Sequence, residues 1–371
     1  MESFTEDLWE MILARLPLKS MTSSKLVCKQ WKAIVESPLL RKIFDSHHQN
    51  SQSSWSLMDR EHEVMAHYGC EIWGLSRSLG SYISFLNEKF ETEKVRYVSY
   101  TEVGLMLIGM PAFSYYVANP ISRQCVELPP IPLSLEVHFF GVSGLVTRIE
   151  NGLLLGYKVV LVRTRCIRSN VSIDVLIYSS EAGLWSFKTI HYSALPVSLK
   201  GKLYWRGMCL DGKEAVVSHD FYAESEQCLI IHFPDSEKNP YFRRAVTASQ
   251  GFIMYINSYK DDLSLRVWRL KSGEWQIVSE ILLETAFDCI LLGMNPFDAN
   301  KMYFKSDVHT CLTFTNLLHK GAKFGLKERS SFGHTLSFEG VLVPQKIERL
   351  YSNYSTFFLP RWLYRIPSPP S

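Results

Sequence analysis

The first 44 residues carry apolar positions at the spacing of short amphipathic helices. Thr5 followed by Glu6 and Asp7 predicts a helix start, because a hydroxyl can cap free backbone N–H groups and acids favour the positive end of a helix dipole. One stripe of a helix with about 3.6 residues per turn then collects Leu8, Trp9, Ile12, Leu13 and Leu16. Pro17 predicts the end of this helix.

A second apolar set follows a short polar connection and predicts further helices. Its members are Val27, Cys28, Trp31, Ile34 and Val35. Ser37 and Pro38 interrupt this set before a last one, which is Leu39, Leu40, Ile43 and Phe44. We therefore expect three or four short helices in a unit of about 40 residues, a size that buries too little surface to be stable alone. The unit is either a helical cap on the following domain or a docking surface for a partner.

The pattern changes to that of short strands after a polar segment. Residues 46–54 contain only Ser, His, Gln and Asn, and they predict a linker between a helical unit at 1–45 and a strand region at 55–371. His47 and His48 are adjacent but lack a second ligand pair, so we expect no metal there. Beyond the linker, short runs rich in Val, Ile, Leu, Tyr and Phe are separated by Gly, Asn, Asp and Ser.

Turn glycines that precede strands recur at a nearly constant interval. Gly104, Gly152, Gly201 and Gly251 are separated by 48, 49 and 50 residues, and a further step of 49 reaches Asn300. Asn, like Gly, tolerates a left-handed turn. An all-strand repeat of this length is typical of propeller blades, and about 310 residues at this period predict about six or seven of them. A pair of antiparallel sandwiches is the alternative.

Aromatic residues of the strand region have two interpretations. They could line a recognition surface, but strand aromatics in propellers mostly pack between blades, so we expect core roles for Trp185, Tyr204, Trp205, Trp268 and Trp275. Binding surfaces more often come from loops between strands. Residues 236–244 and 257–262 are candidate loops of this kind.

Composition narrows the classes of partner. The net charge of the 371 residues is only +3, which gives nucleic acid no strong attraction. The acidic N-terminus is not followed by the apolar core of a signal peptide. Residues 103–122 are uncharged, but Pro111, Asn119 and Pro120 predict two strands with their turns and not a membrane span. We expect no membrane or nucleic-acid partner and a location in the cytoplasm, the nucleus or both.

Signatures of catalysis and metal binding are weak in the sequence. The eight cysteines form no C-x-x-C pair and are expected to be reduced thiols. The patterns G-x-x-x-x-G-K-[ST], H-E-x-x-H and G-x-S-x-G do not occur. His138 and the pair His219–Asp220 stand alone in strand-like surroundings, which is typical of structural histidines. We expect no catalytic residues, no metal and no cofactor.

The helical unit resembles a known module over residues 4–44. The segments DLWEMILARLPLKS and LVCKQWKAIVESP are similar to the F-box, through which F-box proteins bind the Skp-type adaptor of cullin-based ubiquitin ligases. On the matching positions, the resemblance implies that the adaptor-facing residues are Leu8, Ile12, Leu13, Leu16, Pro17, Val27, Cys28, Lys29 and Trp31. Phe4 and Thr5 replace the family's usual Leu-Pro. Ser23 and Ser24 replace larger side chains, which implies a modest loss of docking area.

The strand region resembles the F-box-associated, kelch-related domain of plant F-box proteins. The similar segments are NPISRQCVELPP, IYSSEAGLW, KGKLYWRG and the ending LPRWLYRIPSPPS. Together the two resemblances imply a small all-α F-box followed by an all-β, propeller-like domain. They imply a substrate-recognition subunit of a Skp–cullin–F-box ligase, which binds a protein substrate through its β domain. A kelch-type interaction scaffold, or a sugar-binding or enzymatic propeller with a helical cap, remains the alternative.

Overall fold

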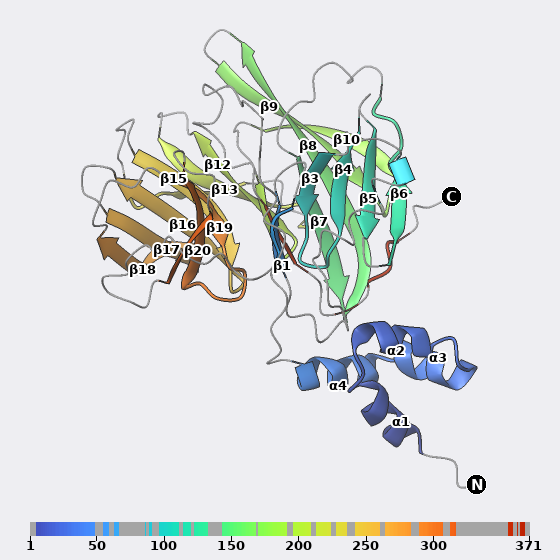
Figure 1. Ribbon diagram of the computed structural model, residues 1–371. Helices are drawn as coiled ribbons and strands as arrows, with labels where there is room; N and C mark the ends of the chain where they lie inside the picture. The colour runs from blue at the N-terminus through green and yellow to red at the C-terminus, as the bar shows by residue number, and fades with distance from the viewer. Residues whose placement is uncertain are drawn as a thin grey trace.

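The structure of the chain is a computed structural model. It describes residues 5–48, 55–58, 63–66, 86, 89–90, 96–110, 114–119, 122–132, 143–167, 170–190, 196–208, 213–223, 228–235, 242–259, 264–282, 289–306, 312–316, 355–358, 362 and 364–367. Four helices open the chain and antiparallel sheets follow, so the prediction of a helical unit ahead of an all-β domain is confirmed. Figure 1 shows the helices together on one side of the sheet domain.

The helices are short and are separated by local signals. They are α1 (Glu6–Leu13), α2 (Leu18–Ser24), α3 (Lys29–Glu36) and α4 (Pro38–His48). Ser37 precedes α4 and its hydroxyl accepts a hydrogen bond from the backbone N–H of Leu40 at 3.0 Å. Pro38 occupies the first helical position, where the missing N–H costs nothing. The helical unit is thus cut into elements by caps and prolines.

Three local expectations for the helices need correction. Thr5 is the N-cap of α1, but its hydroxyl makes no capping hydrogen bond, and its backbone carbonyl accepts from the N–H groups of Leu8 and Trp9 instead. Helix α1 ends at Leu13, before Pro17, which is the N-cap of α2. Helix α4 continues to His48 and therefore takes up the first residues of the segment 46–54 that was expected to be a linker.

Four complete four-stranded sheets follow one another along the chain, and we call them blades 1 to 4. Blade 1 contains β3 (Arg96–Tyr100), β4 (Met106–Gly109), β5 (Tyr115–Asn119) and β6 (Gln124–Glu127). Blade 2 contains β7 (Ser143–Glu150), β8 (Leu153–Ile167), β9 (Asn170–Ser179) and β10 (Leu184–Ile190). Blade 3 contains β11 (Pro196–Leu199), β12 (Lys202–Met208), β13 (Glu214–Asp220) and β14 (Leu229–His232). Blade 4 contains β15 (Phe242–Ser249), β16 (Phe252–Tyr259), β17 (Ser264–Lys271) and β18 (Glu274–Leu282).

Two further sheets complete the described strands. One contains β19 (Cys289–Met294), β20 (Lys301–Ser306) and β21 (Leu312–Asn316). The other contains β1 (Trp55–Met58), β2 (Glu63–Ala66) and β22 (Ser355–Phe358), with β1 paired antiparallel to β22 from Trp55 against Phe358 to Met58 against Ser355. This last sheet joins the two ends of the domain and so closes the succession of sheets, as a propeller requires. The described sheets confirm the propeller interpretation over the alternative of two sandwiches.

The glycines that recur along the sequence occupy the same turn in successive blades. Gly152, Gly201 and Gly251 have φ values of 76°, 74° and 72°, and the residues before them also have positive φ. Two consecutive positive-φ residues form the tight hairpin turn that matches the twist of paired strands, and each turn here leads into the second strand of a blade. Asn300 is different: it precedes β20 without a positive φ, and its backbone N–H and side-chain amide both donate to Asp298.

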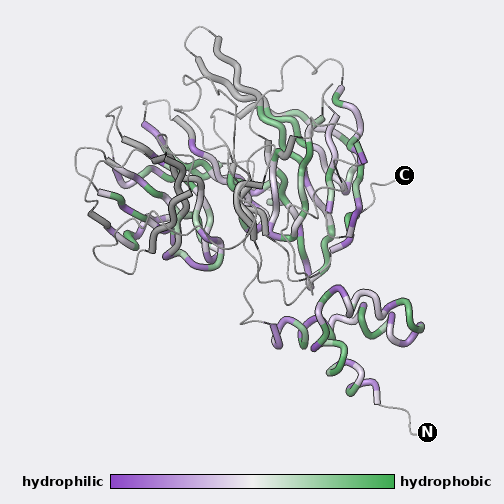
Figure 2. Tube along the Cα trace, viewed as in Figure 1, coloured by the Kyte–Doolittle hydropathy of each residue, from purple (hydrophilic) through white to green (hydrophobic). Residues whose placement is uncertain are grey.

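The apolar core lies between successive blades. Side chains alternate along β4 and the residue before it: Leu105 and Leu107 pack in a cluster shared with blade 2, whereas Met106 and Ile108 pack in a cluster shared with the helices. Similar clusters join blade 2 to blade 3 and blade 3 to blade 4. Figure 2 shows hydrophobic residues running along the strands of blades 1 and 2, whereas the helices alternate hydrophobic and hydrophilic residues. Each blade therefore buries both faces only by stacking on its neighbours.

Candidate docking surface

The helical unit exposes large apolar side chains while keeping a buried interior. Leu13, Leu18, Leu40 and Phe44 have no exposed surface. Leu26 is 90% exposed and Val27 is 65% exposed. The other exposed apolar side chains are Leu8, Met11, Ile12 and Leu39. Exposed apolar side chains at this density in about 40 residues exceed the scattered single residues expected on an ordinary surface, and they indicate a partner.

The residues that the F-box resemblance assigns to the adaptor fall into three groups by exposure. The exposed ones are Leu8, Ile12, Val27, Cys28 and Lys29. Leu16, Pro17 and Trp31 are half-buried, and Leu16 and Trp31 pack against the helical core. Leu13 is completely buried. A role in adaptor binding stays a prediction for all nine, and in this structure Leu13 holds the helices together.

Helices α1 and α3 pack against each other through a pair of aromatic rings. The rings of Trp9 on α1 and Trp31 on α3 are 4.8 Å apart between centroids. Cys28 is the N-cap of α3, and its sulfur accepts a hydrogen bond from the backbone N–H of Trp31 at 3.4 Å. This cap begins α3 directly after the exposed Val27. The α2–α3 junction is therefore a fixed turn, held beside α1 by an aromatic pair.

The two serines that depart from the family pattern differ in environment. Ser23 is exposed and its hydroxyl donates to the backbone carbonyl of Lys19 at 3.0 Å. Ser24 is buried and donates to the carbonyl of Met21 at 2.6 Å. Only Ser23 therefore offers a position where a larger apolar side chain would add exposed area without disturbing the interior.

Two exposed apolar residues, Met11 and Leu26, had no place in the apolar sets read from the sequence, and Leu39, placed in the last set, is exposed as well. Met11 lies beside Ile12 on α1, and Leu26 lies in the turn between α2 and α3. Helical periodicity assigns apolar residues to a buried stripe, so Met11 and Leu26 gave no signal outside it and Leu39 gave the wrong one.

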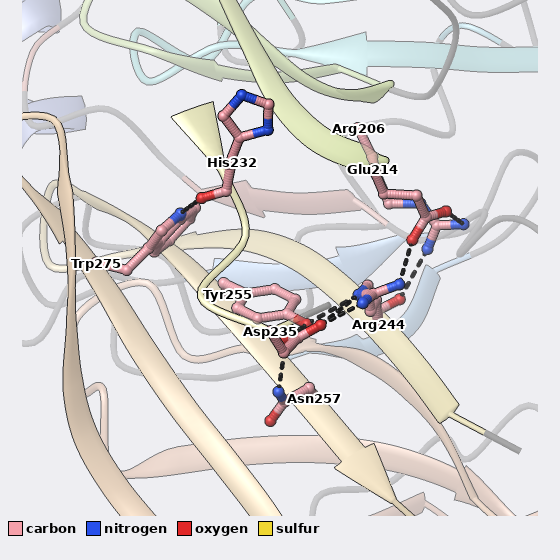
Figure 3. A network of polar contacts seen from close by, with 8 residues as sticks. All are labelled: Arg206, Glu214, His232, Asp235, Arg244, Tyr255, Asn257 and Trp275. Atoms are coloured by element: carbon pink, nitrogen blue, oxygen red, sulfur yellow. Dashed lines mark hydrogen bonds and ion pairs between the residues drawn. The ribbon is translucent and has the colours of Figure 1, made fainter. Parts of the chain in front are cut away.

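Among the described strands, polar side chains form an extended network between blades 3 and 4, which Figure 3 shows. Asp235, which follows β14, accepts hydrogen bonds from Arg244 on β15 and from Tyr255 and Asn257 on β16, the last at 2.9 Å. Arg244 also donates to Glu214 of β13 at 2.5 Å. Blade 3 and blade 4 are thus joined by charged groups with only 11–24% of each of these three side chains exposed.

Burial shapes the protonation of this network. Burial alone would lower the pKa of Arg244, but its hydrogen bond to Asp235 and the negative charge nearby raise that pKa overall. Burial first, and then the hydrogen bond and charge of Asp235, raises the pKa of Tyr255 above its ordinary value. Arg244 therefore stays charged and Tyr255 stays neutral at physiological pH. Hydrogen bonds from Arg244 of blade 4 to Glu214 of blade 3 and to Asp235 at its end join the two blades, which indicates a brace between them.

Two tryptophans make the same contact in different blades. Trp185 on β10 donates its indole N–H to the carbonyl of Pro129, just beyond β6 of the preceding blade, at 2.9 Å. Trp275 on β18 donates to the carbonyl of His232 at the end of β14 of its preceding blade, also at 2.9 Å. Trp205 is 9% exposed. The expectation that strand tryptophans pack between blades is confirmed for these residues.

The other candidate sites from the sequence are structural or lie outside the described residues. His219 is buried with its ring edge-on to Phe221 at 4.5 Å, as expected for a structural histidine, and His138 lies outside the described residues. Of the candidate loops, 236–241 and 260–262 also lie outside them. Within the described ranges, no group of three His, Cys, Asp or Glu side chains could hold a metal ion. None of the helices described has the length and apolar character needed to cross a membrane.

Comparison with known proteins matches both parts of the chain. A family model described as the F-box domain matches residues 1–43. One described as "F-box protein At3g26010-like, beta-propeller" matches residues 53–368. The Arabidopsis thaliana protein named F-box protein At3g28330 is 46% identical, covering 99% of this chain and 97% of that protein. The putative F-box/kelch-repeat protein At1g15680 of the same plant is 34% identical, covering 99% and 95%.

Comparison with solved structures adds little to the family assignment. A six-bladed β-propeller fungal lectin from Aleuria aurantia aligns with a TM-score of 0.36 and 12% identity over 58% of this chain and 71% of that one. Similarity at this level carries no information about ligands.

Proposed function

We propose, from the premise that this chain belongs to the F-box proteins with a C-terminal β-propeller, that it is the substrate-recognition subunit of a Skp–cullin–F-box ubiquitin ligase. The helices dock on the Skp-type adaptor, and through it on the cullin. The propeller binds a protein substrate. The subunit works in the cytoplasm, the nucleus or both.

One observation carries this proposal: the helical unit is packed on one side and apolar on its surface. Phe44 of α4 lies in the same buried cluster as Met106 and Ile108 of blade 1, so the unit is attached to the propeller. Leu26 and Val27, in the α2–α3 junction, stay exposed. A helical unit that served only as a cap would turn its apolar side chains to the domain that it covers. Exposed leucines and valines need a second partner to remove them from water.

The proposed mechanism is proximity. Binding a substrate to the propeller raises the concentration of its lysines near the conjugating enzyme that the ligase recruits, so this subunit does no bond chemistry. Its contribution is the position in which it holds the substrate.

Topology favours the propeller face that points away from the helices as the substrate-binding face. Arg41 of α4 lies against Gly152 in the β7–β8 turn, so the helices lie at the end where the first strand of a blade turns into the second. Consecutive strands are antiparallel, and the strand ends that flank the candidate loops 236–244 and 257–262 therefore lie at the opposite end. A substrate bound there would not compete with the adaptor for space.

The test uses exposed residues, because changing buried ones would unfold the unit. We expect Leu26→Asp and Val27→Asp, separately and together, to abolish co-purification of the full chain with the Skp-type adaptor from cells. Leu184→Asp is the matched control, since Leu184 is 70% exposed but lies on β10 of the propeller. Retained co-purification of the double variant, or none with the unchanged chain, would exclude the docking surface.

A further inference from the structure

Arg41 of α4 lies between the helices and the end of the chain. Its Nη2 donates to the hydroxyl of Tyr364 at 2.6 Å. Its guanidinium carbon lies 5.1 Å from the centre of the Tyr364 ring and 5.3 Å from that of Trp362. Only 17% of the side chain is exposed, and Asp45 one turn later lies 3.8 Å from Nε. The charge is therefore held by a hydrogen bond, two aromatic rings and a carboxylate.

The C-terminal segment around Tyr364 is anchored to blade 1. The backbone carbonyl of Tyr364 accepts from the side-chain amide of Asn119 on β5 at 2.9 Å. The backbone N–H of Ile366 donates to the side chain of Gln124 on β6 at 3.0 Å, and Ile366 is buried in the cluster between blades 1 and 2. The segment is thus part of the propeller. The contacts of Arg41 with Tyr364 and Trp362 therefore attach the helices to the propeller.

Aromatic packing and a glycine complete the contact. Phe44, one turn from Arg41, meets the ring of Trp362 edge-on with centroids 5.7 Å apart. On the other side, a Cβ added to Gly152 would lie 2.4 Å from Nη1 of Arg41, closer than any real contact. Gly152 therefore serves two needs: a φ of 76° in the β7–β8 turn, and clearance for the guanidinium.

We infer that Arg41 is a positioning residue, which sets the angle between the docking helices and the propeller. The inference rests on the proposed function, because the angle matters only where the helices bind an adaptor and the propeller binds a substrate. Without these contacts, α4 would be joined to blade 1 by apolar packing, which is non-directional. The planar guanidinium adds direction, since its hydrogen bond and its ring contacts are satisfied together in one orientation. The helices and the propeller then move as one body, and a bound substrate is held at one place relative to the conjugating enzyme.

The test measures the angle directly in the full chain without adaptor. Dyes on azido residues introduced at Lys19 of α2 and Leu229 of β14, both exposed, report the distance between the two parts by single-molecule energy transfer. We expect one narrow peak in the otherwise unchanged chain and a broadened or shifted peak in Arg41→Ala. Tyr364→Phe removes only the hydroxyl, so it serves as the test if Arg41→Ala fails to fold. It should broaden the peak less than Arg41→Ala does.

Gly152→Ala has a matched control. Gly273, in the β17–β18 turn, has a φ of 85°, and a Cβ there would meet nothing within 4 Å. Both changes strain a turn, but only Gly152→Ala pushes against Arg41. We expect a shifted peak for Gly152→Ala and none for Gly273→Ala. In an Arg41→Ala background, Gly152→Ala should add no further shift, because the obstructing atom is gone.

Two results would overturn the inference: a peak unchanged in Arg41→Ala and Tyr364→Phe, or equal effects of the two glycine changes. Neither result depends on the adaptor. The dissociation constant for the Skp-type adaptor, measured on the same proteins, should be the same in Arg41→Ala as in the unchanged chain, since Arg41 is not among the exposed apolar residues. A chain that shows the peak shifts but never binds the adaptor would refute the proposed function alone.

Discussion

Replacing Asp235 by Asn tests whether the network in Figure 3 braces two blades. The carboxylate of Asp235 accepts from Arg244 through two nitrogens, from the hydroxyl of Tyr255 and from the amide of Asn257. Asparagine has nearly the same shape, but it turns one acceptor into a donor facing these donors and removes the negative charge beside Arg244. The change therefore isolates the electrostatic contribution from the packing.

The size of the stability loss depends on how buried the ion pair is and on which partners Arg244 keeps after the change. Hydrogen bonds to charged groups contribute about 1.5–3 kcal/mol each, and breaking a fully buried ion pair costs about 3–5 kcal/mol. Asp235 is 18% exposed and Arg244 is 11% exposed, so solvent screens the pair only slightly. Glu214 still holds Arg244 after the change. We expect Asp235→Asn to lower the free energy of unfolding by about 2–3 kcal/mol.

Urea unfolding of the full chain, followed by circular dichroism, measures this loss as a lower midpoint at an unchanged slope. Glu280→Gln is the matched control. Glu280 and Arg266 form an ion pair at 2.7 Å on neighbouring strands of blade 4, but 47% and 36% of their side chains are exposed. An exposed pair contributes about 0–1 kcal/mol. If Asp235→Asn cost no more than Glu280→Gln, the network would not be a brace.

Further predictions concern single residues. Ser23→Leu should strengthen adaptor binding a few-fold with unchanged stability, measured by calorimetry, because Ser23 is exposed beside the docking surface. Burial, and then the charges of the acids that precede it, raises the pKa of Glu10; the native state therefore holds the proton longer, and stability should fall as pH rises above the ordinary Glu value of about 4.3. Glu10→Gln should flatten that slope in a pH series of urea unfolding curves; an equal slope in both proteins would contradict the sign. Trp185→Phe and Trp275→Phe should each cost about 1 kcal/mol, since each loses one indole hydrogen bond. Clearly unequal losses would show that the two contacts are not equivalent.

Local sequence signals predicted much of the fold because caps and turns depend on residues that are adjacent in the sequence. Ser37 and Pro38 separate α3 from α4 by capping chemistry alone. Gly152 and Gly201 require positive φ in two-residue turns, so their interval gives the blade period without any knowledge of packing. Asn300 also directly precedes the second strand of its sheet, β20, as the interval predicts, but it does so without a positive φ and with its amide and backbone N–H bound to Asp298, which spacing does not reveal.

The candidate docking surface was predictable only in outline. Periodicity places Leu8, Ile12 and Leu13 on one stripe, yet Leu13 is buried and the other two are exposed. Which edge of an apolar stripe faces inward depends on where the neighbouring helix packs. The pairing of Trp9 with Trp31 makes that decision for α1, and it joins residues 22 positions apart.

By itself, the sequence determined the elements and their order: short capped helices, a regular repeat of glycine-initiated strands, and a family pattern in both parts. Only the tertiary structure decided what depends on residues distant along the chain. The closure of β1 by β22, the brace of Asp235 and Arg244, and the hold of Tyr364 on Arg41 all belong to this second class. The reason is physical: periodicity and capping act within a few residues, whereas these contacts span up to 323 positions and exist only once the blades have stacked.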